Sequence, residues 1–199
     1  MDEPSGRARG GYGRGRGPRK PRATVAERLE SGELDEAEAR ELTREAVLRT
    51  LTASQKSRHE LSASLSRKGY PEHLSQQVLD RLAEVGLIDD ASYAASIVRS
   101  RHAERGLSRR AIAMELRRRG ITAEVAEDAL AQIDDADEAG ACEALAARLL
   151  ARTAGQPSQT RLRKAASALA RRGYPPGQAY EVLRRQLEAL EAEPPSPYP

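Results

Sequence analysis

Arginine is the residue type whose number and spacing in this 199-residue chain point to chemistry. The chain contains 29 Arg against four Lys. Between residues 99 and 119 eight arginines are opposed by two acids, which gives a local charge of +6. A guanidinium remains ionised and donates two parallel hydrogen bonds to a phosphate or carboxylate. We therefore expect an anion-binding surface here, and its candidate residues are Arg99, Arg101, Arg105, Arg109, Arg110, Arg117, Arg118 and Arg119.

A second segment, residues 160–185, has seven basic residues against one acid and again sums to +6. Its candidate binding residues are Arg161, Arg163, Lys164, Arg171 and Arg172. A purely structural role for some of these cations is also open, because basic residues in the last turn of a helix interact favourably with its dipole. The arginines from 99 to 119 have no aromatic neighbours on which bases could stack, so a sequence-independent phosphate contact or an acidic protein partner fits better than base recognition.

Other residue types give no pattern typical of catalysis. His59, His73 and His102 are far apart in sequence, and none is spaced from a Cys as zinc ligands are. The acidic pairs at 89–90 and 134–135 each precede a predicted helix, where capping accounts for them. The single cysteine, Cys142, lies in an Ala/Leu stretch and is predicted to be a small buried residue. We expect no enzyme, no metal site and no cofactor.

The elements that must position the arginines recur three times along the chain. Gly69, Gly120 and Gly173 lie 51 and 53 residues apart, and each follows a leucine and a basic pair. An apolar residue comes directly after each glycine, and an apolar pair begins nine residues after the glycine. A period near fifty residues indicates a repeat architecture, which builds long surfaces more readily than closed pockets.

Cap residues and apolar residues at helical spacing predict nine helices and no strands. The expected fold is all-α, an elongated and curved tandem array of three three-helix repeats, at residues 23–87, 88–134 and 135–190. Each repeat is too small to maintain a core alone, so neighbours must pack together. Residues 1–22 are rich in Gly and Arg with a balance of +5, and residues 191–199 are rich in Pro. Both ends are predicted to be disordered tails.

The composition of the chain restricts its expected location and the way in which it could bind nucleic acid. No apolar run approaches the roughly 18 residues of a membrane span, and no secretory signal follows the basic N-terminus. With one cysteine, the chain suits the cytoplasm. Outside the N-terminal 22 residues the net charge is −2, so binding to nucleic acid must depend on basic patches or on the N-terminal tail.

The segment Gly86-Leu87-Ile88-Asp89-Asp90, followed by Tyr93-Ala94, Arg105-Gly106 and the run AIAMELRRRG-Ile at 111–121, resembles the RecX family of regulatory proteins. The resemblance covers about residues 36–187. In the third repeat Tyr-Pro follows Gly173 where the second repeat has Ile-Thr, and the loop at 153–160 is unusually long.

This resemblance implies a non-enzymatic helical modulator that binds the RecA recombinase filament on single- or double-stranded DNA, acts in DNA repair and the SOS response, and restrains recombinase activity. We expect a monomer without a membrane partner. A different class remains open, a general helical protein that binds DNA or RNA without sequence preference. A general nucleic-acid binder should lose affinity steeply as the salt concentration rises, whereas a filament modulator should act on the recombinase only when the filament is present.

Overall fold

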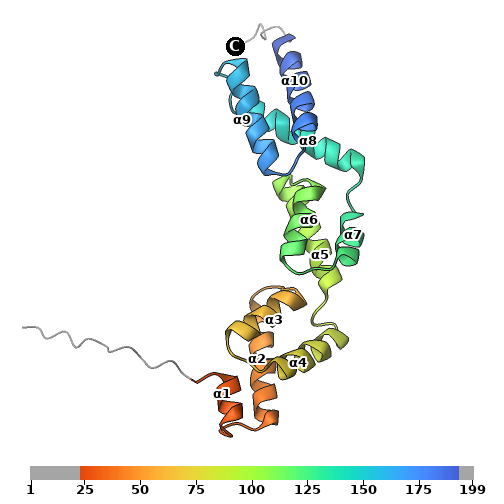
Figure 1. Ribbon diagram of the computed structural model, residues 1–199. Coiled ribbons are helices and arrows are strands. Elements are labelled where there is room, and N and C mark those ends of the chain that lie inside the picture. Colours follow the sequence, from red (N-terminus) through yellow and green to blue (C-terminus); the bar gives the residue numbers. More distant parts are fainter. Residues whose placement is uncertain (1–22, 193–199) are drawn as a thin grey trace, which may run out of the picture.

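The computed structural model describes residues 23–192, and these fold as an all-helical, elongated and curved array (Figure 1). The first unit contains α1 (Val25–Glu30), α2 (Glu36–Ala53), α3 (Arg58–Arg67) and α4 (Glu72–Glu84). The second contains α5 (Asp90–Arg99), the π-helix η1 (Ser100–Glu104), α6 (Arg109–Arg118) and α7 (Ala123–Leu130). The third contains α8 (Asp135–Ala151), α9 (Ser158–Arg171) and α10 (Pro176–Ala192). The predicted disorder of residues 1–22 and most of 191–199 concerns positions outside the described residues.

Local signals explain where these helices begin. Thr24, Asp35, Ser57 and Asp134 each form a reciprocal capping box with an acid three residues later.

Within residues 23–192 the nine expected helices are present, and α1 and η1 are additional. The helix expected to run from about 90 to 105 ends as α5 at Arg99 and continues as the π-helix. The eighth helix begins at Ser158, inside the segment predicted to be a loop.

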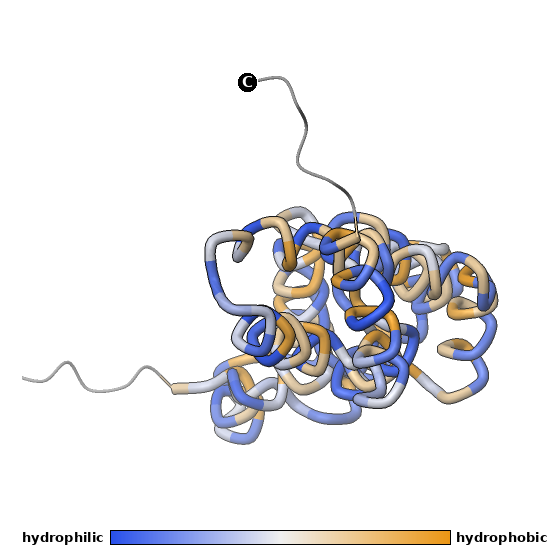
Figure 2. Tube along the Cα trace, turned by 90° about the horizontal axis from the view of Figure 1, so that it is seen from above, coloured by the Kyte–Doolittle hydropathy of each residue, from blue (hydrophilic) through white to orange (hydrophobic). Residues whose placement is uncertain are grey.

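Each unit has its own hydrophobic core. Val47, Leu61 and Leu79 lie in the first, together with Ile88, which is one residue beyond the predicted end of that repeat. Ile97, Ile112 and Leu116 belong to the second, and Cys142, Leu169 and Leu183 to the third. Apolar residues gather where neighbouring helices face one another when the array is seen from above (Figure 2). The prediction of a buried Cys142 is confirmed, since its side chain is fully enclosed and desolvation raises the pKa of the thiol.

Gly120 and Gly173 lie at the joints between helices of successive units, and Gly69 lies at the joint between α3 and α1 of the first unit. All three have positive φ, 72°, 74° and 89°, a region that favours glycine. A Cβ at Gly120 would overlap the His59 ring, and one at Gly173 would overlap the Ser108 side chain. Glycine is therefore required here by close approach as well as by conformation.

These joints place four helices end to end along one side of the array, in the order α9, α6, α3, α1 (Figure 1). The Arg172 carbonyl at the end of α9 accepts from the Ser108 amide at the start of α6, over 3.0 Å. The Arg119 carbonyl at the end of α6 accepts from Ser57 Oγ at the start of α3, over 2.5 Å. The Gly69 carbonyl after α3 accepts from the Ala26 amide in α1. Orphan carbonyls at one helix end thus bind donors at the start of the next helix.

Candidate binding surface

The thirteen candidate cations divide into two groups in the structure. Five are engaged within the protein: Arg101, Arg109, Arg119, Arg161 and Arg172. Eight are exposed and form no ion pair among residues 23–192: Arg99, Arg105, Arg110, Arg117, Arg118, Arg163, Lys164 and Arg171. Spacing along the sequence could not separate these groups, because the partners of the engaged arginines are mostly distant in the chain.

A partly buried network at the joint between the first two units accounts for Arg101 and Arg119. The Glu115 carboxylate receives two hydrogen bonds of 2.9 Å from Arg101 and one of 2.7 Å from Arg119 Nη2. Arg119 also donates to the Tyr93 hydroxyl over 2.6 Å, and Tyr93 donates to Glu60 of α3 over 3.1 Å. Hydrogen bonding from Arg101, together with Arg119, lowers the pKa of Glu115 from 4.5 to about 2. These two cations connect α6 to its neighbours and are not free for an external anion.

Arg109 and Arg161 also have structural roles. Arg109 joins the second unit to the third, because its guanidinium lies 3.0 Å from Asp135 and 3.3 Å from Glu138, and its amide donates to Glu138. Arg161 is only 9% exposed and donates to the Leu150 carbonyl at the end of α8, over 3.3 Å. A cation at a helix C-terminus is favourable electrostatically. Of the predicted binding candidates, Arg161 is therefore the one whose burial leaves little of the side chain accessible to a partner.

The free cations of α6 surround an exposed apolar side chain. Met114 is 60% exposed. At about 100° per residue, Arg110, Met114, Arg117 and Arg118 fall within an arc of roughly 100° on the side opposite the buried Ile112 and Leu116. Arg119 falls outside this arc, which explains why it alone among the last three arginines of that run is paired. We call Arg110, Met114, Arg117 and Arg118 the α6 face.

A cavity of about 550 Å³ adjoins the α6 face, where α6 meets the end of α9 and the turn that leads into α10. Arg110, Met114 and Arg118 line one side, and Arg171, Tyr174 and Pro176 line the other. Tyr174 is almost fully enclosed, and desolvation raises the pKa of its hydroxyl to about 12. The surface therefore combines unpaired cations with an apolar contact, an arrangement suited to an anionic protein surface.

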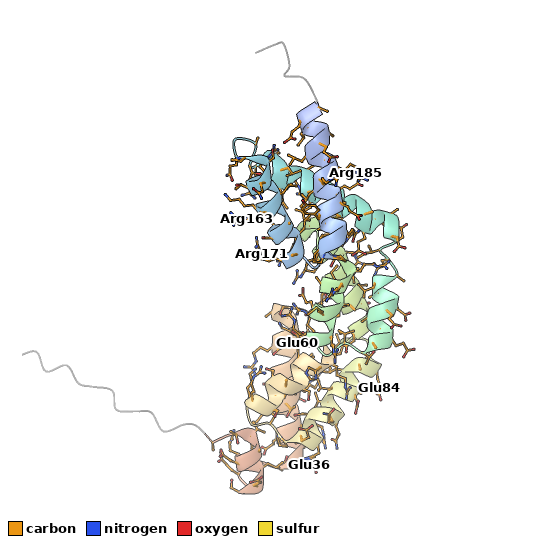
Figure 3. All side chains as sticks on the ribbon, turned by 45° about the horizontal axis from the view of Figure 1, so that its top comes forward. Glu36, Glu60, Glu84, Arg163, Arg171 and Arg185 are labelled. Carbon is orange, nitrogen blue, oxygen red and sulfur yellow. The ribbon has the colours of Figure 1, made fainter. Side chains whose placement is uncertain are left out.

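Charge is unevenly distributed over the three units. Residues 23–87 carry nine basic and twelve acidic side chains, whereas residues 135–192 carry nine basic and seven acidic ones. In Figure 3, Glu36, Glu60 and Glu84 lie in the lower part, while Arg163 and Arg171 project from one side of α9 and Arg185 from α10. Arg184 and Arg185 are paired with Glu188 and Glu143, so α10 is largely neutralised. The unpaired charge of the third unit lies on the α8 and α9 side.

Sequence reasoning missed two cations of that side, Arg148 and Arg152. Both are exposed and neither forms an ion pair among residues 23–192. They lie four residues apart at the end of α8, so they share one face of the helix. Their spacing was visible in the sequence, but their proximity to the arginines of α9 follows only from the antiparallel packing of the two helices.

No group of three or more His, Cys, Asp or Glu side chains within residues 23–192 could hold a metal ion. None of the helices in this described part is long and apolar enough to cross a membrane.

An all-helical array of three three-helix units defines a modular helical-repeat protein. Residues 44–82, 89–130 and 136–183 match the RecX first, second and third three-helix domains. The chain belongs to the RecX family.

Relatives and solved structures agree with this membership. The chain is 43% identical over 152 residues to a protein of Thermobifida fusca named Regulatory protein RecX, covering 75% of this chain and 82% of that protein. A protein of the same name from Streptomyces coelicolor is 41% identical over 166 residues, covering 83% and 88%. A crystal structure of regulatory protein RecX aligns with TM-score 0.67 and 25% identity over 79% of this chain and 78% of that one. The RecX structure from Lactobacillus salivarius, at 23% identity and TM-score 0.64 over 79% and 99%, shares the fold.

Proposed function

We propose that this protein binds a RecA-type recombinase filament on DNA and restrains the activity of the recombinase without catalysing a reaction itself. Family membership supports the regulatory role, since the relatives are named regulatory proteins. The observation that favours direct binding is the α6 face. An exposed methionine surrounded by unpaired arginines can bury apolar surface at its centre while the guanidinium groups bind carboxylates around it. The elongated body can extend over several subunits of a repeating partner.

The α6 face can be tested by charge reversal. In the variant Arg110→Glu/Arg117→Glu/Arg118→Glu the local charge changes by −6, which converts attraction to an anionic surface into repulsion. Arg109 is left intact because it holds α8. The helix should persist, since Glu and Arg have similar helix propensities. We expect the variant to lose inhibition of ATP hydrolysis by purified recombinase on single-stranded DNA.

A matched control reverses three exposed arginines of the first unit, Arg44→Glu/Arg49→Glu/Arg81→Glu. It has the same change of charge and should still inhibit. Equal helicity of both variants by circular dichroism is required for the comparison. Full inhibition by the folded α6 variant would contradict the assignment of this face and move the working surface to the third unit.

The second candidate function, general binding of DNA or RNA, is favoured by the unpaired cations of α8 and α9. The two candidate functions predict different dependence on protein amount, on the filament and on salt. A filament regulator acts well below one molecule per recombinase subunit and requires the filament. A general DNA binder acts in proportion to the DNA covered and weakens steeply with salt.

A further inference from the structure

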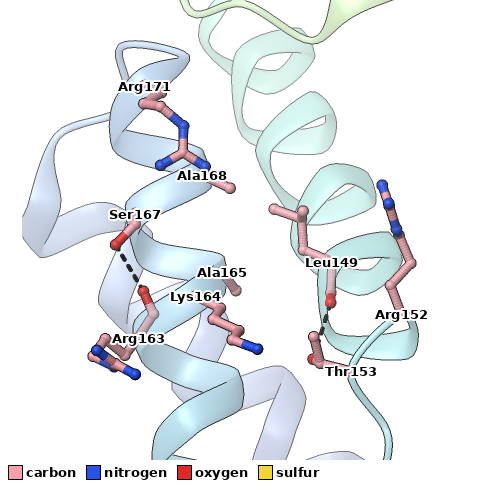
Figure 4. Close-up of a pocket in the computed structure, with 9 residues that line it drawn as sticks. All are labelled: Leu149, Arg152, Thr153, Arg163, Lys164, Ala165, Ser167, Ala168 and Arg171. Carbon is pink, nitrogen blue, oxygen red and sulfur yellow. Dashed lines mark hydrogen bonds between the residues drawn. The ribbon is translucent and has the colours of Figure 1, made fainter.

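The strongest unassigned feature of the molecule is a groove between α8 and α9 in the third unit (Figure 4). It encloses about 560 Å³ and is lined by nine residues. Four of them are cations and none is acidic: Arg152 at the end of α8, and Arg163, Lys164 and Arg171 on α9. The other five lining residues are uncharged: Leu149, Thr153, Ala165, Ser167 and Ala168. We call this the α8–α9 groove.

The cations of the groove are available to an external anion. Arg152, Arg163, Lys164 and Arg171 are all exposed and have no ion pair within residues 23–192. Lys164 Nζ donates to the neutral amide oxygen of Gln156 over 2.8 Å, which leaves its charge uncompensated. On α10, by contrast, Arg184 lies 2.9 Å from Glu188. The third unit thus neutralises its arginines on one side and leaves them free on the other.

The groove continues toward the second unit. A neighbouring cavity is lined by Arg105, Arg148 and Arg172 and shares Leu149, Arg152 and Arg171 with the groove. Only one acid, Glu104, lines this continuation. Along α9 alone, Arg163 and Arg171 are eight residues apart, which corresponds to roughly 12 Å at 1.5 Å per residue. Each strand of a duplex places one phosphate about every 3.4 Å along the helix axis, so a duplex whose axis lay along α9 would present roughly three or four phosphates of one strand over this length.

We propose that the α8–α9 groove binds the phosphodiester backbone of nucleic acid independently of sequence. No aromatic side chain lines it, so bases have no stacking surface there. Apart from Leu149, its uncharged lining consists of small side chains, which offer little apolar surface to the anchor residues typical of a protein interface. A shallow basic path suits evenly spaced phosphates better than an acidic peptide. The inference deepens the proposed function by assigning DNA contact to the third unit and recombinase contact to the α6 face.

The test is direct binding of a short labelled duplex in the absence of recombinase, with the full-length chain. The groove variant is Arg152→Gln/Arg163→Gln/Lys164→Gln. Arg171 is retained because it also lines the cavity beside the α6 face. We expect the affinity to fall at least about tenfold near 0.1 M salt. The slope of log affinity against log salt should fall by about 2 to 3, at roughly 0.9 per phosphate contact.

The matched control is Arg81→Gln/Arg184→Gln/Arg185→Gln, which removes the same charge from exposed, paired positions outside the groove. It should change the affinity less than about twofold, because exposed pairs contribute little and screening limits distant charges. Equal losses in the two variants would show an effect of net charge alone and overturn the proposal. So would a groove variant that binds the duplex normally but loses binding to polyglutamate, which would indicate an acidic peptide.

The two proposals fail separately. The proposed function fails if the wild-type chain leaves recombinase ATP hydrolysis unchanged. The groove assignment fails if the groove variant and its control bind the duplex equally.

Discussion

Glu115 is the residue that decides how many arginines of the second unit are free. Its carboxylate is shared by Arg101 and Arg119, and both cations are thereby withdrawn from the surface. Arg119 then reaches Tyr93 and Glu60, so one acid in α6 fixes contacts to α5 and to α3. Because the side chain is 14% exposed, these bonds are formed with little competition from water.

The variant Glu115→Gln tests this role through pH. The folded-state pKa of about 2 lies below the ordinary 4.5, so the stabilisation is complete above about pH 4.5 and is lost as the pH falls through about 2. The lowering corresponds to roughly 3 kcal/mol. We expect the variant to be less stable than wild type by about this amount at pH 7, and the difference to shrink toward pH 2. Urea denaturation across this range measures it.

Glu84→Gln is the control for that measurement. Glu84 is 64% exposed and pairs only with the exposed Arg81, so its loss should cost less than about 1 kcal/mol at any pH. If the difference between wild type and Glu115→Gln does not vary with pH, the carboxylate does not contribute through its charge.

Helix α6 shows how one element serves two purposes. Ile112 and Leu116 are fully buried in the second core, while the opposite side forms the α6 face. The last turn places Arg117 and Arg118 near the helix C-terminus, where cations are favourable, so the structural and binding roles of these arginines do not conflict. Leu116 lies four residues after Ile112, so both side chains fall on the same side of the helix and both are buried.

Truncation of Leu116 should therefore destabilise the second unit. We expect Leu116→Ala to cost about 2–5 kcal/mol, since a buried leucine loses its burial and leaves a cavity. Met114→Ala on the same helix is the control and should cost far less, because Met114 is 60% exposed. Denaturation midpoints compare the two. Similar denaturation midpoints for the two variants would contradict the burial of Leu116 in the core of the second unit.

At the scale of the whole molecule, the shape depends on the joints between units. Successive units meet through helix ends and a few polar bonds, while each apolar core lies within one unit. A change at one joint should therefore alter the overall shape more than the helix content. The spacing between the α6 face and the α8–α9 groove also depends on these joints.

Gly120→Ala tests this dependence against Gly86→Ala. The two glycines have almost the same φ, 74° and 73°, so the backbone strain of an alanine is similar, about 1 kcal/mol. A Cβ at Gly86 meets nothing within 4 Å, whereas one at Gly120 overlaps His59 of the first unit. We expect Gly120→Ala alone to change the small-angle scattering profile, with helicity retained. Indistinguishable scattering profiles for the two variants would show that the side chains around residue 120 accommodate the added methyl group without a change in the arrangement of the units.

The sequence was sufficient for the all-α class, the threefold repeat and most helix bounds, because caps, stop glycines and apolar periodicity act over a few residues. The same reasoning could have found α1, whose signal is the Thr24–Glu27 capping box. The π-helix η1 had no comparable local signal in this sequence. The identity of Leu116 and Cys142 as core residues also followed from local pattern.

Tertiary structure alone decided which cations are free. Arg119 pairs with Glu60 across 59 residues, and Arg109 with Glu138 across 29. The α8–α9 groove exists because two antiparallel helices bring Arg152 close to Arg163 and Lys164. The sequence determined that the second and third repeats are basic. An ion pair depends on distance in space, so only the packing of the units could determine which arginines were neutralised and which remained able to bind a partner.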